Sequence, residues 1–520
     1  MAFPYKIFKE YGYVLLLMAL IFAAFSFALN NAQEGGDSAL YLIGAKSLAE
    51  GTGYFDISPP EPAAFVYPPL YSVILAPIVY IFGTNYFAAK LLSLIFTVLS
   101  IFPAYLIARR FFGGTISLLI SATFALNLVV LWYSHRILSD APFLFLSLIA
   151  MLLLLKLAKG QGYFYAVSAA VFIGISYLAR TAGLALCLAA GLSFMIGRNL
   201  RALAILAIVM SLPFLALSSY SNIAKEHGAN VYTGQFFLED VGDPLSRKLP
   251  VPEAAARSIS TIPARAYFYF LISIPQVVFP PLDIMNWFFE GSMLIPLIGF
   301  FVFLIVAIGF AAQAKRGISP LHIYSLLYLA VLLFWISWDP SAVDRFILPI
   351  ALFLIIFFAE GIRTAASRIR LPAGLTAEHA VLGVLLACIL VSAGSDAYYL
   401  STIQQRTFDA KYMDFIEANE WVADHASPSD IVWSNMPKRT FLLTGLHTVG
   451  PAARSGNELL ETLSMHGVGY VLASSEYGGT HEQSIAAISN RLSLVHASEN
   501  GKTRVYKFNN RLNLLVDPNE

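Results

Sequence analysis

Apolar runs, each close to the length that crosses a lipid bilayer, follow one another along most of the chain. A membrane-spanning helix needs about 20 predominantly apolar residues, and about eleven segments come close to that requirement. These candidate spans are 11–29, 86–108, 114–133, 142–158, 163–178, 182–197, 202–220, 291–313, 319–338, 346–361 and 378–399. The pattern therefore predicts a polytopic all-α membrane protein with about 11 transmembrane helices.

Basic residues fall in the turns on one side of the membrane if the proline-containing segment 66–82 does not cross the bilayer. We expect this segment to be a re-entrant or interfacial helix. The inner turns then hold Lys6 and Lys9, Arg109 and Arg110, Lys156 and Lys159, Arg198 and Arg201, Lys315 and Arg316, and Arg363, Arg368 and Arg370. Cytoplasmic loops are enriched in lysine and arginine. We therefore expect a multi-pass protein of the inner (plasma) membrane, with the N-terminus in the cytoplasm and the C-terminus outside.

Two outer segments are long, 30–85 and 221–290. We expect interfacial helices in the first. The second begins with polar residues and ends in an aromatic-rich stretch, which favours an interfacial or re-entrant element. One extra pair of crossings there would bring the spans to about 13 and leave both termini on the same sides.

From about residue 400 the sequence becomes typical of a small α/β domain. We expect strands at 430–434, 469–474 and 503–508, and helices at 409–426, 455–466 and 480–491. The pattern thus predicts a membrane domain, 1–399, and an extracytoplasmic α/β domain, 400–520, which is periplasmic in a Gram-negative cell. The histidines of the second domain are scattered, without the spacing of a metal site.

Composition agrees with a membrane protein. Only 12% of the residues are charged and 58% are hydrophobic, whereas a soluble domain carries about 25% charged residues. The net charge of +1 gives no reason to expect a nucleic-acid partner. Cys187 and Cys388 lie in apolar runs, so we expect no disulfide framework.

Asp37 is the first acidic side chain that could carry chemistry. It follows Gly35 and Gly36 just after the first predicted span, and two glycines allow a sharp turn that returns the carboxylate to the membrane surface. The side chain could act as a general base or bind an acceptor hydroxyl. Alternatively, it simply caps a helix over 38–50, because aspartate is a preferred N-cap residue.

Asp140 and Arg136 are the only charged residues between Phe111 and Leu155. Charges at a membrane boundary are costly and mark candidate functional sites. On a helix, residues four apart share one face. The two either form an ion pair at the end of a span or face a polar cavity at the outer surface. Arg136 and the neighbouring His135 are both candidate contacts to the substrate or its phosphate.

Two more arginines stand at outer turns. Arg180 is the only charge in its pair of short apolar spans; it suits a phosphate or another anion by bidentate contact, or it reaches to the interface. Arg345 follows Asp344 and lies near Asp339. It either binds an anion or pairs with those acids.

Tyrosines accompany the first acidic residue and the prolines of the outer loop. Tyr67 and Tyr71 lie in VYPPLYS (66–72), where the prolines stiffen the backbone. They either line a substrate groove or belong to the aromatic belt at the membrane surface. Tyr41 is a further candidate substrate contact.

The order of these segments is specific. One span is followed by an outer Asp near a Tyr, then by YPPLYSVILAPIVYIFG, NYFAAKLLSLIFTVLSIFPAYLIARRFFGG, YSHRILSDAPFLFLSLIAMLLL and GISYLARTAGLAL. Over roughly residues 10–200 the chain resembles the dolichyl-phosphate-mannose–protein mannosyltransferase-like branch of the GT-C superfamily of membrane glycosyltransferases. Bacterial aminoarabinose transferases belong to the same group. The segment 344–349 matches weakly, and the C-terminal domain resembles those appended to bacterial members.

The resemblance implies the GT-C fold and transfer of a hexosyl or pentosyl group from a polyprenyl-phosphate sugar donor. The acceptor is expected to be a lipid, glycan or protein hydroxyl at the outer face, in contact with membrane lipid. By the same resemblance, Asp37 is the catalytic base, Asp140 shapes the catalytic site, and Arg180 is the best match for a contact to the carrier phosphate. Direct displacement with inversion is the expected course, since a lipid phosphate leaves without an acid and the acceptor hydroxyl needs a base.

The chain departs from the family at three positions. Ser38 stands where a second acid often follows the first, Leu40 where aminoarabinose transferases have a basic residue, and Tyr67 where they have a lysine. No organic cofactor is expected. A divalent cation remains possible, but no paired-acid motif supports it.

A transporter or flippase for a lipid-linked or polar substrate is the alternative function. It predicts internal repeats and interrupted helices with charges near the midplane. The sequence has no evident internal repeat, and its isolated charges gather at the outer boundary. A scaffold protein would leave Asp37 and Asp140 unexplained.

Overall fold

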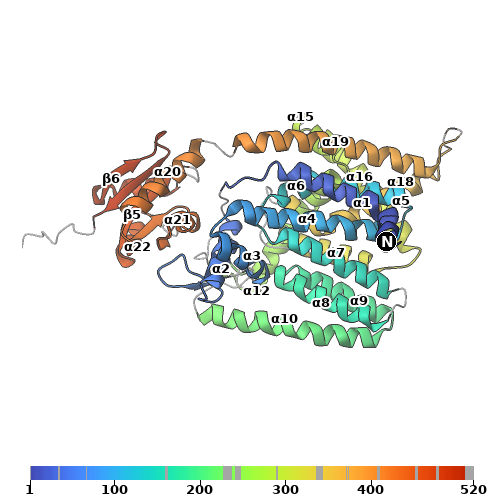
Figure 1. Ribbon diagram of the computed structural model, residues 1–520, viewed down its shortest axis with the longest axis horizontal. Coiled ribbons are helices and arrows are strands. Elements are labelled where there is room, and N and C mark those ends of the chain that lie inside the picture. The colour runs from blue at the N-terminus through green and yellow to red at the C-terminus, as the bar shows by residue number, and fades with distance from the viewer. Residues whose placement is uncertain are drawn as a thin grey trace, which may run out of the picture.

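A computed structural model describes residues 2–32, 36–65, 67–158, 162–226, 237–239, 247–288, 291–334, 343–370, 372, 374–406, 410–450, 455–475 and 480–509. Within these ranges the chain forms a bundle of helices with a small α/β unit at one end (Figure 1). The N-terminus lies at the opposite end of the bundle. The helical prediction is therefore confirmed, and the α/β unit adds the only large sheet among the described residues.

Long apolar helices make up most of the bundle. Among the described residues, six helices contain a stretch long and apolar enough to cross a membrane. They are α4 (Tyr86–Ala108), α7 (Asp140–Leu157), α10 (Leu200–Glu226), α16 (Leu294–Ala314), α18 (Val343–Ala366) and α19 (Ala377–Arg406). A seventh span arises if α5 (Gly114–Ala125) and α6 (Leu128–Ser134), which are bent by 55°, cross together.

The other predicted spans also fall on helices, but these are shorter in their apolar parts. They are α1 (Ala2–Ser26), α8 (Tyr163–Ala179), α9 (Gly183–Ile196) and α17 (Pro320–Phe334). Each predicted span thus falls mainly on helix where the structure describes it, with 114–133 divided between α5 and α6. The number that actually crosses stays a prediction.

The first outer loop folds into two short helices and a small hairpin at the end of the bundle that faces the α/β unit (Figure 1). The elements are α2 (Asp37–Ala49), β1 (Phe55–Asp56), β2 (Ala63–Ala64) and α3 (Leu70–Phe82). With 13 residues, α3 is shorter than the roughly 20 residues that a span needs, as expected for an interfacial or re-entrant helix. A Cβ on Gly44 would lie 2.8 Å from Ser72 Oγ and from the Tyr54 ring, so α2 packs tightly here.

The aromatic-rich end of the second long outer segment is a broken run of short helices. It comprises α12 (Val251–Ser260), α13 (Ile262–Phe268), the π-helical turn η1 (Tyr269–Ser273), α14 (Ile274–Val278) and α15 (Pro281–Phe288). The polar start of that segment, 227–236 and 240–246, lies outside the described residues.

Glycines allow the inner helices to touch backbone to backbone. A Cβ on Gly299 of α16 would lie 1.9 Å from the Leu271 carbonyl oxygen of η1. A Cβ on Gly309 would lie 1.8 Å from the Phe357 carbonyl oxygen of α18. Small residues at such crossings are the usual means of close helix packing in membranes.

The α/β unit contains a five-stranded sheet in the order β4-β3-β5-β7-β6. β3 (Ile431–Ser434) is parallel to β4 (Thr448–Val449) and β5 (Val468–Ser474), and β7 (Thr503–Phe508) is antiparallel to β5 and β6 (Leu492–Ala497). The helical elements are α20 (Ala410–His425), α21 (Pro437–Thr444), α22 (Gly456–Met465), α23 (Thr480–Ala487) and the 3-10 turn η4 (Ser489–Arg491). The three expected strands are confirmed, whereas β4, β6 and α21 were not predicted.

Candidate active site

Asp37 is the first residue of α2, and Gly36 before it has φ 60° and ψ −132°. That backbone conformation is readily adopted only by glycine. The N-cap position belongs to Gly36, and no side chain caps the helix. The alternative interpretation of Asp37 as the cap of a helix over 38–50 is therefore wrong. Its carboxylate instead accepts hydrogen bonds from the Tyr67 hydroxyl at 2.9 Å and from Arg345 Nη1 at 2.8 Å.

Arg345 joins the two acidic residues that the sequence singled out. Its Nη1 contacts Asp37 Oδ2 at 2.8 Å, and its Nη2 contacts Asp140 Oδ2 at 2.9 Å. Its Nε donates to both oxygens of Asp140, at 3.2 and 3.0 Å. The sequence offered an ion pair with a nearby acid, Asp344 or Asp339, as one interpretation of Arg345. The ion pairs found among the described residues join it to the distant Asp37 and Asp140 instead. Asp339 itself lies outside the described residues.

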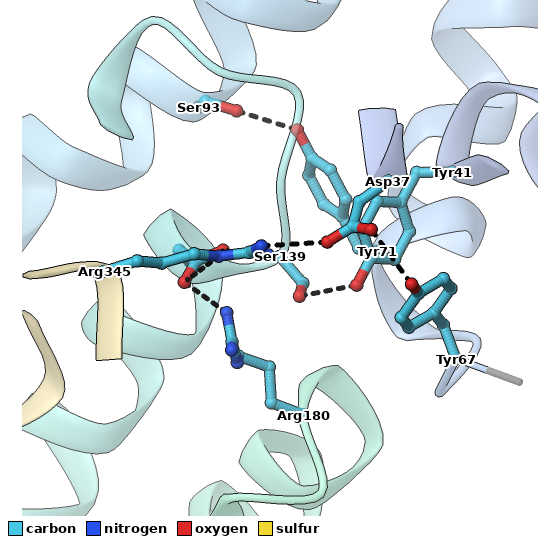
Figure 2. Close-up of polar contacts among 9 residues, drawn as sticks. Asp37, Tyr41, Tyr67, Tyr71, Ser93, Ser139, Arg180 and Arg345 are labelled. Atoms are coloured by element: carbon cyan, nitrogen blue, oxygen red, sulfur yellow. Dashed lines mark hydrogen bonds and ion pairs between the residues drawn. The ribbon is translucent and has the colours of Figure 1, made fainter. Parts of the chain in front are cut away.

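Asp140 is the first residue of α7 and accepts from two arginines. Besides Arg345, it is bonded to Nη1 of Arg180, which lies in the turn between α8 and α9 (Figure 2). Burial acts to lower the pKa of Arg180, but the adjoining Asp140 carboxylate outweighs it and raises that pKa above its ordinary value. The guanidinium is therefore a permanent positive charge at this end of the bundle.

Tyr41, Tyr67 and Tyr71 lie near Asp37 on the side of the first outer loop, and the hydroxyl of Tyr67 bonds its carboxylate (Figure 2). Tyr41 shares a hydrogen bond of 2.8 Å with Ser139, the residue before Asp140. Tyr71 shares one of 2.7 Å with Ser93 of α4. The ring centres of Tyr41 and Tyr67 are 5.4 Å apart, so this loop and the start of α7 meet through aromatic and hydroxyl contacts.

The two carboxylates differ in access to solvent. The side chain of Asp37 is 29% exposed, whereas that of Asp140 is 2% exposed. A reacting hydroxyl can reach the first but not the second without a rearrangement. The charges of Asp37, Asp140, Arg180 and Arg345 sum to zero, which lowers the cost of grouping them at a membrane boundary.

The spacing of four residues suggested that Arg136 and Asp140 share one face of a helix. In the structure neither Arg136 nor His135 lies on one helix with Asp140. The helix α6 ends at Ser134 and α7 begins at Asp140, so the i, i+4 relation of residues 136 and 140 does not apply. The Arg136 guanidinium lies 5.2 Å from the centre of the Trp132 ring. The ring nitrogens of His135 face the carbonyl oxygens of Leu131, at 3.0 Å, and of Phe25, at 2.8 Å. These contacts tie α6 to α1.

Ser139 and Ser93 were not predicted as parts of this site. Both are buried, and each bonds a tyrosine that the sequence had singled out. No motif marks a single serine in an apolar run. Only the position of Ser139 next to Asp140 could have indicated it.

Among the described residues, no group of three or more His, Cys, Asp or Glu side chains is placed to hold a metal ion. The oxygens of Asp37 and Asp140 are engaged by arginine and tyrosine donors. Ser38, where a second acid often stands, contributes no carboxylate.

Comparison with known proteins gives a family match over part of the chain. Residues 66–221 match the family model described as dolichyl-phosphate-mannose-protein mannosyltransferase. This stretch includes Tyr67, Asp140 and Arg180, but neither Asp37 nor Arg345. No curated protein sequence matches the chain.

Solved structures extend the similarity of fold to nearly the whole chain. ArnT from Cupriavidus metallidurans bound to undecaprenyl phosphate is 14% identical with a TM-score of 0.60, over 96% of this chain and 98% of that one. The Archaeoglobus fulgidus oligosaccharyltransferase in the apo form is 16% identical with a TM-score of 0.57, over 98% and 76%. Arabinofuranosyltransferase AftD from Mycobacteria is 13% identical with a TM-score of 0.54, over 96% and 41%.

These matches agree with the resemblance drawn from the sequence. The structural neighbours are glycosyltransferases of the GT-C fold, and the family model covers the segment that carries the loop prolines, Asp140 and Arg180. The chain therefore has the fold of the GT-C membrane glycosyltransferases, and its residues 66–221 carry the sequence pattern of their dolichyl-phosphate-mannose-protein mannosyltransferase family.

Proposed function

We propose that this glycosyltransferase moves a sugar from a polyprenyl-phosphate-linked donor to an acceptor hydroxyl at the outer face of the membrane. The observation that carries the proposal is the cluster of an accessible carboxylate, a buried carboxylate and two guanidiniums at one end of the bundle. A base and a permanent cation are what a displacement at a sugar phosphate requires.

Arg180 is the proposed contact for the donor phosphate. Its bond to Asp140 uses Nη1, and a guanidinium has five N–H donors in a planar fork that matches phosphate oxygens. Arg345, in contrast, already directs Nε, Nη1 and Nη2 at carboxylates. The phosphate would therefore meet donors on Arg180 without first breaking the bridge between Asp37 and Asp140.

Asp37 is the proposed base, and Asp140 the residue that fixes both arginines. The acceptor oxygen forms a bond to the anomeric carbon while the bond from that carbon to the phosphate oxygen breaks. The hydroxyl proton passes to Asp37, and the electron pair leaves on the phosphate next to Arg180. A single displacement of this kind inverts the configuration of the anomeric carbon. The exposure of Asp37 supports its role, since only an accessible carboxylate can receive the proton.

The names of the family model and of one structural neighbour refer to two classes of sugar, hexoses and pentoses. The family model names a mannosyl group, a hexose, and one neighbour is an arabinofuranosyltransferase, which moves a pentose. We therefore propose a hexosyl or pentosyl group as the transferred sugar. One neighbour is bound to undecaprenyl phosphate, which supports a polyprenyl-phosphate donor, and another is tethered to an acceptor peptide, which supports a protein acceptor. Hydroxyls of lipids and glycans are the other proposed acceptors.

We propose an inner-membrane protein with a cytoplasmic N-terminus and an outer domain formed by residues 400–520. The basic turns of the sequence and the N-terminus belong to the end of the bundle opposite the α/β unit, and positive charge favours the cytoplasmic side. The cluster around Asp37 then lies at the outer face, next to the proposed outer domain.

Two measurements on the full chain in nanodiscs test the proposal. The first is binding of undecaprenyl phosphate, and the second is transfer of sugar from polyprenyl-phosphate-linked donors. We expect Arg180→Ala to weaken binding by about tenfold or more, because a charge-assisted contact of about 1.5–3 kcal/mol is lost. Arg136→Ala is the matched control, since Arg136 lies at the same end of the bundle but over Trp132. Equal affinity in wild type and Arg180→Ala would remove Arg180 from the phosphate site.

A further inference from the structure

Helix α21 of the α/β unit docks on the first outer loop. Phe441 of α21 is buried against Ile43 of α2 and Phe65, which follows β2. Lys46 of α2 lies over the Phe441 ring, with its Nζ 5.9 Å from the ring centre. This apolar contact joins the α/β unit to the loop that begins at Asp37.

A charged contact lies beside the apolar one. Lys438 of α21 forms an ion pair with Asp56 of β1, and its Nζ donates to Ser58 Oγ at 2.8 Å. Asp56 is buried, and its Oδ1 also accepts from the Ser58 backbone N–H at 3.0 Å and from the Ser58 hydroxyl at 2.7 Å. The Thr448 N–H of β4 donates to the Ser58 carbonyl at 2.7 Å. The hairpin therefore receives its ion-pair partner and a backbone donor from the α/β unit.

The membrane bundle holds the same hairpin from another side. The hydroxyl of Tyr220, at the outer end of α10, donates to the Tyr54 carbonyl at 3.3 Å and accepts from the Phe65 N–H at 2.7 Å. The hairpin between these residues is thus fixed by α10 on one side and by the α/β unit on the other.

The hairpin has little intrinsic stability without these contacts. Its strands have two residues each, and an isolated hairpin is marginal at best. Helix α2 packs against α3, but its first turn, which carries Asp37, has no side-chain cap. Asp37 stands before the hairpin along the chain, and its partner Tyr67 stands soon after it. The distance between them therefore depends on what holds the hairpin.

We propose that the α/β unit positions the carboxylate of Asp37, with Lys438 as the positioning residue that acts through Asp56. This inference rests on the proposed function, because it assigns to the outer unit a part in the same reaction. Lys438 touches neither substrate nor the Asp37 carboxylate in this role. Loosening the hairpin moves Asp37 and Tyr67 but leaves Arg180 in place, because Arg180 lies in the turn between α8 and α9.

The inference predicts a separation of kinetic effects. Misplacement of a catalytic group by about 1 Å costs up to about 100-fold in rate, so Lys438→Met should lower kcat by about 10- to 100-fold. Affinity for undecaprenyl phosphate should stay within about twofold of wild type, since its proposed cation does not move. A general loss of folding would lower both together.

Amide hydrogen exchange and kinetics on the full chain in nanodiscs test this inference. We expect Lys438→Met to speed exchange in residues 54–65 and at the start of α2, while Lys438→Arg restores protection. Asp56→Asn removes the same ion pair by a change in the loop and leaves the sequence of the α/β unit unchanged. Lys507→Met is the matched control, because Lys507 is an exposed lysine of β7 over the Tyr470 ring.

Wild-type exchange in Lys438→Met and Asp56→Asn would overturn the positioning role, as would faster exchange with an unchanged kcat. The first result is independent of the proposed function, whereas the second requires a wild-type chain that transfers sugar. A wild-type chain that neither binds undecaprenyl phosphate nor transfers sugar from any polyprenyl-phosphate donor would instead refute the proposed function, whatever the exchange pattern.

Discussion

Neutralising Asp37 and Asp140 separately, each by an amide of the same shape, should produce two different defects. Asp37→Asn removes the proposed base but leaves Arg345 paired with Asp140. Asp140→Asn removes the carboxylate that both arginines share. Asp37→Asn should therefore impair the reaction itself, and Asp140→Asn should disturb the positions of Arg180 and Arg345.

The expected magnitudes follow from the exposure of the two side chains. The carboxylate of Asp37 is 29% exposed, and an ion pair open to solvent is worth about 0.2–1 kcal/mol. Its neutralisation should therefore change stability little, while loss of a general base lowers kcat by about 10²- to 10⁴-fold. Asp140 is 2% exposed, and breaking a buried pair costs about 3–5 kcal/mol, because uncompensated charges remain in the interior.

Thermal unfolding in detergent and the rate of sugar transfer, measured on the same preparations, separate the two cases. We expect Asp37→Asn to retain the wild-type Tm within a few degrees and to lose transfer. For Asp140→Asn we expect a clear fall in Tm together with loss of undecaprenyl phosphate binding. The reasoning is refuted if Asp37→Asn transfers sugar at the wild-type rate, or if Asp140→Asn is as stable as wild type.

Three further predictions concern the backbone, the outer unit and metal ions. Gly36→Ala should destabilise the start of α2 by about 1–3 kcal/mol, because alanine rarely adopts the backbone conformation of Gly36. We expect a lower Tm and a lower kcat for transfer. Gly383→Ala is the control and should not lower Tm, because the added methyl group would meet no atom within 4 Å. Burial acts to raise the pKa of Asp414, but hydrogen bonds from Asn500 and the Lys502 N–H hold it below its ordinary value of 3.8. Its stabilising effect is therefore fully present above about pH 5 and is lost as the pH falls through 3.8 and then through the lowered pKa. Asp414→Asn should therefore flatten the acid limb of a plot of Tm against pH. Transfer should persist in EDTA, because arginine and tyrosine donors occupy the oxygens of Asp37 and Asp140. Abolition by EDTA and recovery with Mg²⁺ or Mn²⁺ would contradict this.

The spans could be predicted because every segment that crosses the bilayer needs about 20 predominantly apolar residues. The predicted span 86–108 coincides with α4, and the segment 66–82, predicted to be interfacial or re-entrant, contains the 13-residue helix α3. Helix breaks within a span were not predictable. The segment 114–133 was predicted as one span, yet it bends by 55° between α5 and α6. Asn127 at that break bonds the Val277 carbonyl of α14, a contact that no local pattern contains.

The candidate residues could be predicted singly, but not their pairs. Asp37, Asp140 and Arg180 were each recognised from the cost of an isolated charge beside apolar runs, which depends on local sequence alone. The bond between Arg345 and Asp37 joins residues 308 positions apart. Short spacing instead suggested Arg136 for Asp140, and Asp344 for Arg345. The structure replaces both near neighbours with distant partners, because the ends of several helices meet at one end of the bundle.

The paired charges also explain how one cluster can serve both stages of the proposed transfer. Before reaction the four side chains are neutral in sum, and a donor phosphodiester adds one negative charge. Transfer protonates Asp37 and leaves a phosphate monoester with a charge of about −1.5 to −2. The total is therefore nearly unchanged, but negative charge has moved from Asp37 to the phosphate. Arg345 loses its attraction to Asp37 at the stage when charge develops on the leaving group, and it keeps its bonds to Asp140. An arginine held by a buried carboxylate, with one edge on the base, can thus turn toward the phosphate without leaving the site.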